Sequence, residues 1–412
     1  MKILFVHQNF PGQYRHLAGH LAAVPGNQVV FITQHVNGAL PGVRTLVYKP
    51  QREVTQHLHH YLRDTEAGVL NAQAVARVAL DLKKSGFVPD VMVGHNGWGE
   101  IWYLKDVFPH SPLLGYFEFF YRMHGTDVGF DPSEKQSVDT APRIRTKNLG
   151  NLLGLQAADC GQCPTAWQKS TYPELYQASL HVVHEGIDTD LAVPDDQARL
   201  RVPGSDLELA AGDEVLTYTA RNLEPYRGFP SFMRSLPAIL DARPQAQVLI
   251  VGGDEVSYGA RLPQGQSYRQ KMLAELGDAL DQRRVHFLGK LPHPVFLKVL
   301  RISRVHVYLT YPFVLSWSML EAMAAGCLVV ASRTAPVEEV VRDGENGLLV
   351  DFFNPKAIAE RVIAALAEPA RFAQLRVHAR QSVVAAYDLK RICLPAQLQL
   401  IEAVAGRTKL TV

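Results

Sequence analysis

One stretch limits the fold of this chain more than any other: residues 305–326, with the sequence VHVYLTYPFVLSWSMLEAMAAG. It opens with an apolar run of strand length and ends in a helix-forming run closed by Gly326. Pro312 cannot join a strand ladder, so the strand ends before it, while Ser316 or Ser318 can cap the helix that follows. The free N–H groups of the first helical turn then predict a phosphate site at the carboxyl edge of a parallel sheet.

Strands and helices alternate along the whole chain in the same way. In the first half we predict strands at residues 2–6, 28–33, 43–48, 91–95 and 113–118, near 160 and at 181–185, and helices at 13–23, 54–84 and 143–158. In the second half we predict strands at residues 214–220, 247–253, 285–289, 305–309 and 328–332, and a last helix from about 389 to 404. A polar stretch, 123–142, is predicted to be a long loop.

The alternating pattern dissolves between residues 188 and 212, which are rich in Pro, Asp and Gly, and we place a domain boundary there. The expected architecture is α/β, with two doubly wound, Rossmann-like domains at 1–195 and 205–388. A C-terminal helix within 389–412 is expected to pack back across the domain interface. Two such domains facing each other would enclose a ligand cleft.

Composition excludes several classes of protein. With 412 residues and 47% hydrophobic content, the chain can form two cores, and a net charge of +2 without long basic runs does not suggest a nucleic-acid groove. Four cysteines are too few for a disulfide framework, and no apolar run is long enough to span a membrane. The start, MKILFVHQNFPG, lacks the apolar core of a signal peptide. We therefore expect a cytoplasmic protein.

Candidate binding residues in the second half follow predicted strands. Arg221 and Arg227 lie at a strand end and at the start of the next helix, where paired guanidinium donors suit a diphosphate, although surface ion pairs also explain such residues. Gly252 and Gly253 end another strand and allow a ligand to approach the backbone closely. Glu321 lies about one turn into the helix of the opening stretch, where it can accept hydrogen bonds from sugar hydroxyls or remain an ordinary surface carboxylate.

His95 and Glu118 are predicted near the carboxyl ends of two strands in the first half, the edge at which open α/β sheets bind ligands. A histidine at such a place can also serve as a core or capping residue.

The motifs of the second half together resemble the retaining glycosyltransferases of family 4, which have the GT-B architecture. These motifs are Arg221, Arg227-Gly228, Gly252-Gly253, FLGKL, LEAMAAGCLVVAS and APVEEVVRDGENGLLV. The resemblance covers nearly the full chain and is looser in the first half. It implies that the second domain binds a nucleotide-diphosphate sugar, UDP- or GDP-linked, and that the first binds a saccharide, lipid-linked or other hydroxyl acceptor. It also implies hexosyl transfer without a metal or other cofactor and a role in polysaccharide biosynthesis. Contact with the inner face of a membrane is left open, because acceptors in the family are often lipid-linked while this chain has no marked basic amphipathic helix.

Carried onto this sequence, the resemblance assigns the donor site. Arg221 matches the family's arginine and Arg227 its lysine, both of which hold the donor diphosphate. Glu321 matches the second glutamate of the E-x7-E motif, which binds the ribose, whereas Phe313 replaces the first, which touches the donor sugar. This change leaves the sugar open and favours an unusual or deoxygenated one. The further donor-binding candidates are Gly12, Gly252, Gly253, Gly289, Leu291, Val314, Leu315 and Ser316, the last three through their backbone N–H groups.

In the first domain the resemblance places Glu118 where many relatives have a histidine at the reaction centre. Glu118 would orient the acceptor or accept its proton, or else pair with Arg122, and His95 would line the same cleft. The remaining acceptor-binding candidates are Trp98, Tyr116, Tyr121 and Arg122.

Three other functions share parts of this pattern. A nucleotide-sugar epimerase has the same two-domain plan, and a non-catalytic nucleotide-sugar-binding protein fits the altered motif positions. A dinucleotide dehydrogenase is disfavoured because no G-x-G-x-x-G follows Val6 or Val251.

Overall fold

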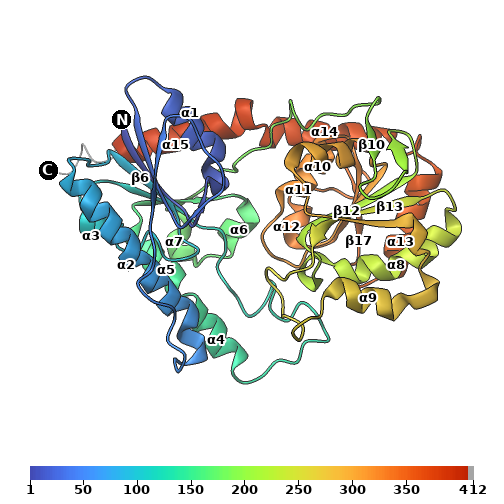
Figure 1. Ribbon diagram of the computed structural model, residues 1–412, viewed down its shortest axis with the longest axis horizontal. Coiled ribbons are helices and arrows are strands. Elements are labelled where there is room, and N and C mark those ends of the chain that lie inside the picture. Colours follow the sequence, from blue (N-terminus) through green and yellow to red (C-terminus); the bar gives the residue numbers. More distant parts are fainter. Residues whose placement is uncertain (407–412) are drawn as a thin grey trace. The chain divides into compact units, whose positions relative to one another are not determined.

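The computed structural model describes residues 1–406 and divides into two compact units (Figure 1). The first unit contains Met1–Gly186 and the chain from Lys390 onward, and the second contains Ile187–Leu389. The two segments that connect the units lie side by side, because Ile187 at the start of the second unit forms an isolated bridge with Asp388 near its end. The second unit thus begins one residue before the 188–212 stretch in which we placed the boundary.

The first unit is built on a seven-stranded parallel sheet of order β5-β3-β1-β6-β7-β8-β9. Its strands are β1 (Lys2–Val6), β3 (Gln28–Thr33), β5 (Val43–Val47), β6 (Val91–His95), β7 (Leu113–Tyr116), β8 (Cys160–Cys163) and β9 (Leu180–Val182); β2 (Asn9–Phe10) and β4 (His35–Val36) form a separate pair. Its helices are α1 (Arg15–Ala23), α2 (Arg63–Lys84), α3 (Leu104–Val107), α4 (Thr140–Lys147), α5 (Leu149–Ala157), α6 (Ala166–Ser170), α7 (Glu174–Gln177) and α15 (Leu394–Gly406).

Alternation along the strands divides the core of the first unit between two faces. Ile3 and Phe5 of β1 pack with buried residues of α1 and α15, whereas Leu4 and Val6 pack with those of α2 and α3. Successive side chains of a strand point to opposite faces, so a strand buried on both sides reads as a continuous apolar run. The predicted strand Lys2–Val6 is confirmed for this reason.

Two predicted helices of the first unit differ in extent. The helix expected from residue 54 begins only at Arg63, after a 3-10 turn at His60–Leu62. The helix expected at 143–158 is two helices that meet at Asn148, whose side chain bonds both the N–H (3.0 Å) and the C=O (2.7 Å) of Tyr121. An Asn engaged with backbone in this way competes with a continuing helix.

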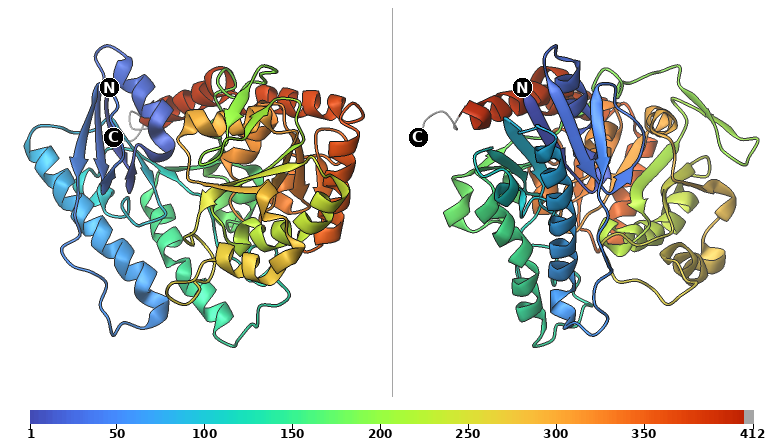
Figure 2. Two further views of the ribbon diagram at one scale, coloured as in Figure 1. Left: turned by 45° about the vertical axis from the view of Figure 1, so that its right-hand side comes forward. Right: turned by 60° about the vertical axis from the view of Figure 1, so that its left-hand side comes forward.

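The last helix, α15, belongs to the first unit, where it contacts α1, β6 and β7 (Figure 2). Leu400, Ile401 and Val404 are its buried residues in that core. The expected C-terminal segment also included 407–412, which lie outside the described residues.

The second unit contains a six-stranded parallel sheet of order β14-β13-β12-β15-β16-β17 and a separate hairpin, β10-β11. Its strands are β10 (Arg199–Arg201), β11 (Glu208–Ala210), β12 (Val215–Asn222), β13 (Gln247–Gly253), β14 (Val285–Gly289), β15 (Val305–Tyr308), β16 (Leu328–Ser332) and β17 (Leu348–Val350). Its helices are α8 (Phe229–Ala242), α9 (Tyr268–Leu276), α10 (His293–Ile302), α11 (Trp317–Ala324), α12 (Ala335–Glu338), α13 (Pro355–Ala367) and α14 (Ala373–Tyr387).

The hairpin and β17 are additions to the predicted strands of this unit. Leu200 and Leu209 of the hairpin pack against α10, where they contact Val299 and Ile302. The apolar side chains of this otherwise polar segment are therefore buried. The five predicted parallel strands are all present, and their order places the carboxyl ends of β12 and β15 next to each other.

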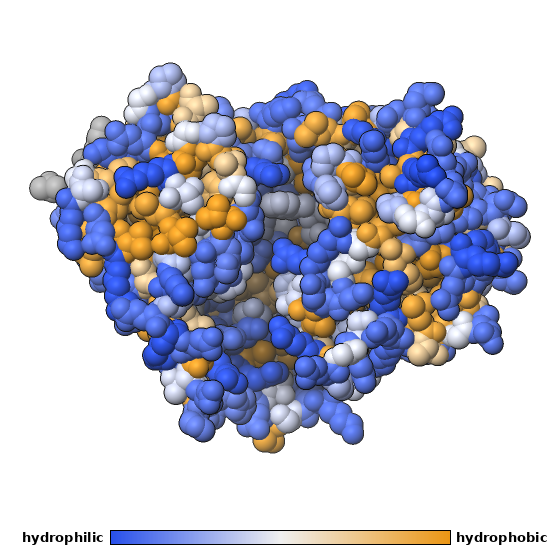
Figure 3. Space-filling model, in the orientation of Figure 1, coloured by the Kyte–Doolittle hydropathy of each residue, from blue (hydrophilic) through white to orange (hydrophobic). Residues whose placement is uncertain are grey.

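Among the residues that the structure describes, no helix is long and apolar enough to cross a membrane. On the face drawn in Figure 3, hydrophilic residues surround smaller groups of apolar ones.

Candidate functional site

Arg227 lies at the centre of the candidate site in the second unit. It ends the short turn Pro225–Arg227 between β12 and α8, and its side chain is buried. Nη1 donates to Thr310 Oγ1 (2.8 Å), to Val314 O (3.0 Å) and, at 3.4 Å, to the Tyr308 hydroxyl. The guanidinium therefore fastens the segment between β15 and α11 to the end of β12, a structural role that the sequence did not reveal.

The charge of Arg227 is retained despite its burial. Burial lowers the pKa of the guanidinium, but Tyr308, Tyr258 and Glu224 raise it, and the net shift is upward. Gly228, which follows, has φ +69°, and a Cβ there would meet Leu309 Cβ at 2.3 Å. Only glycine fits this left-handed position, which brings the arginine up against the sheet.

Arg221 differs from Arg227 in its environment. It lies near the carboxyl end of β12 and is exposed. The predicted pair of diphosphate-binding arginines thus consists of one exposed side chain and one that already holds the loop beside it.

The segment before α11 presents fewer backbone donors than predicted. Ser316 caps the helix by accepting from Ser318 N–H (3.3 Å), but its own N–H donates to the Tyr308 hydroxyl (2.9 Å) and is not available to a phosphate. Within the part of the chain that the structure describes, no hydrogen bond occupies the N–H groups of Val314 and Leu315. Of the three predicted backbone donors, these two therefore remain available.

Phe313 is buried within an aromatic cluster. Its ring lies 5.7 Å from that of Tyr226 and 5.0 Å from that of Tyr258, and Tyr226 stacks on Tyr311 at 4.6 Å. The family that this chain resembles has a carboxylate at this position. Here the position is apolar, and so are the rings around it.

Glu321 is mostly buried and has a partner that sequence reasoning missed. Its Oε1 lies 2.6 Å from Nε2 of His293, the first residue of α10. No spacing rule links residues 28 positions apart, so only the packing of α10 beside α11 reveals this pair.

The predicted donor-side glycines play different parts. A Cβ on Gly252 would meet the backbone oxygen of Ala220 at 2.8 Å, so glycine is required there, whereas one on Gly253 would meet the end of the Lys290 side chain, Cε, at 2.5 Å, which can move away. Gly289 has φ +64° and open space around it. Leu291 packs against the core beside the β10-β11 hairpin.

In the first unit, His95 ends β6 and is buried between two rings. It stacks on Trp98 (4.6 Å) and Tyr116 (5.0 Å), and its Nδ1 accepts from Gly97 N–H at 2.9 Å. Its Nε2 lies 3.8 Å from Oε2 of Glu118 and has no hydrogen-bond partner among the described residues. Burial, then the nearby His7, lower the pKa of His95 well below its usual range, so the ring is neutral and carries its proton on Nε2.

Gly12 lies directly over a second histidine, His7, which sequence reasoning did not single out. His7 accepts from Asn9 N–H (2.9 Å), bonds Gln13 Oε1 through Nε2 (2.6 Å), and meets the ring of His95 edge-on at 5.1 Å. Gly12 has φ +52°, and a Cβ there would meet the His7 ring at 2.6 Å.

Three acceptor-binding candidates have structural roles in this unit. The Tyr116 hydroxyl is buried and donates to Glu185, so it does not line a surface. Arg122 donates to the carbonyl oxygens of Thr171 (2.6 Å) and Ser170 (3.0 Å), and its predicted contacts with Glu118 and with the acceptor stay predictions.

Tyr121 lies beneath the ammonium of Lys147, at 4.0 Å from its ring centroid. Trp98 and Glu118 are partly exposed and stay candidates for the acceptor side.

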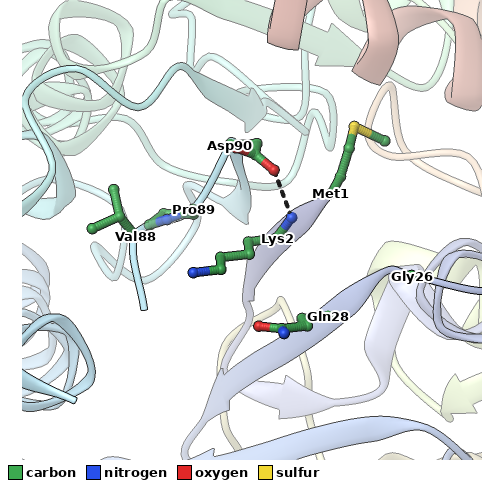
Figure 4. A pocket seen from close by; sticks show the side chains of 7 residues that line it. All are labelled: Met1, Lys2, Gly26, Gln28, Val88, Pro89 and Asp90. Carbon is green, nitrogen blue, oxygen red and sulfur yellow. Dashed lines mark hydrogen bonds between the residues drawn. The ribbon is translucent and has the colours of Figure 1, made fainter. Parts of the chain in front are cut away.

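A recess of about 350 Å³ in the first unit lies at the opposite edge of the sheet, where β1, β3 and β6 begin (Figure 4). It is crossed by a hydrogen bond from Lys2 N–H to Asp90 Oδ2 (2.7 Å). Its lining contains none of the predicted site residues: Met1, Lys2, Gly26, Gln28, Val88, Pro89 and Asp90.

Two family models match the chain and divide it between them. The model described as glycosyl transferase family 4 group matches residues 25–192, and the one described as glycosyl transferases group 1 matches residues 206–382. The second match contains the donor-side candidates from Arg221 to Glu321.

Several proteins similar in sequence are glycosyltransferases. A D-inositol 3-phosphate glycosyltransferase of Streptomyces scabiei is 29% identical over 56% of this chain and 51% of its own length. A GDP-mannose-dependent alpha-(1-6)-phosphatidylinositol monomannoside mannosyltransferase of Mycolicibacterium smegmatis is 26% identical over 62% of this chain and 63% of its own. The chain thus spans between about half and two thirds of the length of these relatives.

Solved structures share the fold over nearly the whole chain. The sucrose-phosphate synthase of Thermosynechococcus elongatus has a TM-score of 0.70 at 19% identity, covering 98% of this chain and 100% of its own. Anabaena Alr3699/HepE, solved in complex with UDP-glucose, has a TM-score of 0.64 at 15% identity, with both chains covered completely. With the two doubly wound units, these likenesses confirm the predicted GT-B fold class, and the matches over both units show that the chain belongs to family 4 of the group 1 glycosyltransferases.

Proposed function

We propose that this protein is a retaining glycosyltransferase that moves a sugar from a nucleotide-diphosphate sugar to a hydroxyl acceptor without a metal. The second unit would bind the donor, and the first unit the acceptor, which is a saccharide or a lipid-linked molecule. One observation supports this function most: a charged, buried Arg227 ties the end of β12 to the segment in front of α11, inside the region that the group 1 model matches. This is the edge at which open parallel sheets bind ligands.

The donor diphosphate would lie between exposed Arg221 and the start of α11. Its negative charge grows as the bond to the sugar breaks, so positive groups there stabilise the transition state more than the ground state. Arg221 supplies a full charge, and the helix start supplies the partial charge and the free N–H groups of Val314 and Leu315. The ribose hydroxyls would bind Glu321, whose carboxylate His293 holds in place.

The acceptor would be oriented near Glu118, and the proton of its attacking hydroxyl would pass to that carboxylate or to the departing phosphate oxygen. In a retaining transfer the acceptor attacks from the face at which the nucleoside diphosphate leaves. Oε2 of Glu118 lies 3.8 Å from Nε2 of His95, so the two acceptor-side candidates of the first unit are neighbours.

UDP is the first donor nucleotide to test, because a solved neighbour is described with UDP-glucose; GDP follows, because a relative is described as GDP-mannose-dependent. Thermal unfolding should be measured with UDP, GDP, dTDP and ADP, each with EDTA present, since a ligand that binds only the folded state raises the melting temperature. A rise with one nucleotide identifies the donor base.

The matching nucleotide sugar should then be incubated with candidate acceptors, and the product anomer should be assigned by NMR. Retention with EDTA present supports the full proposal. Inversion, or a requirement for added metal, contradicts those parts of it. Donor conversion without an acceptor would instead indicate an epimerase, and binding without turnover would indicate a non-catalytic nucleotide-sugar-binding protein.

A further inference from the structure

Glu224 is a fully buried carboxylate in the second unit that none of the proposed steps uses. It lies between β12 and α8 and is 0% exposed. Its two oxygens accept hydrogen bonds from three consecutive backbone N–H groups, those of Ser257 (3.1 Å), Tyr258 (3.0 Å) and Gly259 (2.9 Å). Burying a carboxylate is costly unless hydrogen bonds compensate it, and bonds to a charged acceptor are about twice as strong as neutral ones. Glu224 therefore clamps this segment firmly.

The clamped segment belongs to the long connection between β13 and α9. Two further hydrogen bonds hold it at either side: the Asn222 side chain bonds Ser257 Oγ at 2.8 Å, and the Tyr268 hydroxyl donates to Ala260 O at 2.8 Å. Without these bonds, a connection of this length would sample many conformations. The anchors instead give residues 257–260 one defined position beside the end of β12.

The clamp places the ring of Tyr258 against two residues of the candidate donor site. The ring centroid lies 5.3 Å from Cζ of Arg227 and 5.0 Å from the ring of Phe313. Tyr258 also raises the pKa of Arg227, through its charge interaction and a hydrogen bond. Since 36% of Tyr258 remains exposed, part of its ring is free to meet a ligand while the rest packs on its neighbours.

We propose that Glu224 is a positioning residue of the donor site and that it acts through Tyr258. Tyr258 and Phe313 form an aromatic wall beside the Arg227 charge, an arrangement suited to a nucleoside diphosphate whose apolar atoms pack on the rings. Glu224 itself touches no donor; it fixes the backbone that carries Tyr258. This inference rests on the proposed function, in which the second unit binds the nucleotide sugar.

The test compares donor affinity in Glu224→Gln with that in Glu214→Gln. Glutamine keeps the shape of Glu224 but offers one acceptor oxygen in place of two, so its grip on the three N–H groups weakens. Glu214 lies at the other end of β12, where it pairs with Arg243. Calorimetric titration with UDP and with GDP should show about tenfold weaker binding, in Glu224→Gln, of the nucleotide that the wild type binds, because Tyr258 is no longer held in its position. Glu214→Gln should bind as the wild type does.

Two readouts separate positioning from a general loss of structure. Amide hydrogen exchange should accelerate at residues 257–259 in Glu224→Gln, while the strands β12 and β13 stay protected. In a Tyr258→Ala background, Glu224→Gln should cause no further loss of nucleotide affinity, because the group through which it acts is gone.

The possible failures are distinguishable. If the wild type binds a nucleotide and folded Glu224→Gln binds it equally well, the positioning role is wrong and the proposed function stands. If Glu224→Gln weakens binding equally with and without Tyr258, action through Tyr258 is wrong. If the wild type binds neither UDP nor GDP, the positioning role is overturned for these donors together with this part of the proposed function.

Discussion

Nη1 of Arg227 donates a hydrogen bond to the carbonyl oxygen of Val314, at 3.0 Å. The two residues belong to different βα connections, one following β12 and the other following β15. The family resemblance assigns the charge of Arg227 to the donor diphosphate. The same side chain also holds the segment between β15 and α11 in position. Arg221 is exposed near the end of β12 and does not hold this segment, so substitutions of Arg221 and of Arg227 can be compared directly.

Arg221→Ala and Arg227→Lys should both reduce donor turnover, but only the second should destabilise the fold. Lysine keeps the charge of Arg227, but its shorter side chain does not bring the ammonium to the position of Nη1, which bonds both Thr310 and Val314. We expect a loss of about 1–3 kcal/mol in the free energy of unfolding for Arg227→Lys and less than about 0.5 kcal/mol for Arg221→Ala. Urea unfolding measures the first quantity.

For Arg221→Ala, kcat/KM for the nucleotide sugar should fall about tenfold or more, because a charged contact to the diphosphate is lost. Near-normal turnover in this variant would remove Arg221 from the site.

Glu321→Gln should weaken binding of the donor nucleotide about tenfold by removing a charged acceptor for the ribose hydroxyls. The sharper test is the 2′,3′-dideoxy form of the same nucleotide, which has no hydroxyls to offer. Wild type and Glu321→Gln should bind it equally, because the lost contact no longer exists in either complex. A tenfold difference with the dideoxy nucleotide would show that Glu321 acts through structure instead, by way of its pairing with His293.

Much of the fold was predictable because parallel strands that are buried on both faces appear in the sequence as continuous apolar runs. The strands Lys2–Val6, Gln28–Thr33, Gln247–Gly253 and Leu328–Ser332 have the predicted bounds for this reason. The hairpin β10-β11 was missed because its short strands alternate polar and apolar residues within a stretch rich in loop formers. The break between α4 and α5 was missed because it depends on Asn148 meeting the backbone of Tyr121, 27 residues away.

The candidate site was predictable in its position but not in its contacts. We predicted the positions of four site residues from the ends of the predicted strands, because the carboxyl ends of parallel strands all lie at one edge of the sheet. These residues are Arg221, Arg227, His95 and Glu118. The clamp by Glu224 and the pairing of His293 with Glu321 join distant segments and leave no local signal. The cleft expected between the two domains stays a prediction.

Gly12→Ala should impair the acceptor side of the first unit. Gly12 adopts φ +52°, which costs an alanine about 1–2 kcal/mol, and the new Cβ would meet the His7 ring at 2.6 Å. His7 packs edge-on against His95, so a displaced His7 disturbs the stack beside Glu118. We expect kcat with acceptor to fall, and unchanged nucleotide affinity in this variant would remove Gly12 from the donor-binding candidates. Gly26→Ala, with φ +85° and open space, is the control for backbone strain alone.

Glu100 should make the stability of the first unit fall as the pH rises from about 4.5 to 7. Its carboxyl group is fully buried, with Oε1 accepting from the Tyr48 hydroxyl at 2.8 Å and Oε2 without a partner among the described residues. Burial raises its pKa from 4.5 to about 7, more than the bonds from its own backbone and from Tyr48 lower it. The folded state therefore binds more protons than the unfolded state in this window, and stability is lost as the group ionises.

Glu100→Gln cannot ionise, so its free energy of unfolding should lack this component. Between pH 4 and pH 8 the wild type should lose about 3 kcal/mol relative to the variant, the equivalent of the shift from 4.5 to about 7. His7 acts in the opposite direction, because burial lowers its pKa from 6.5 to about 4 and stability falls as the pH drops through that range. This contribution is common to both proteins and cancels in their difference. Denaturant unfolding at several pH values measures that difference, and parallel profiles would mean that folding leaves the pKa of Glu100 at its unfolded value.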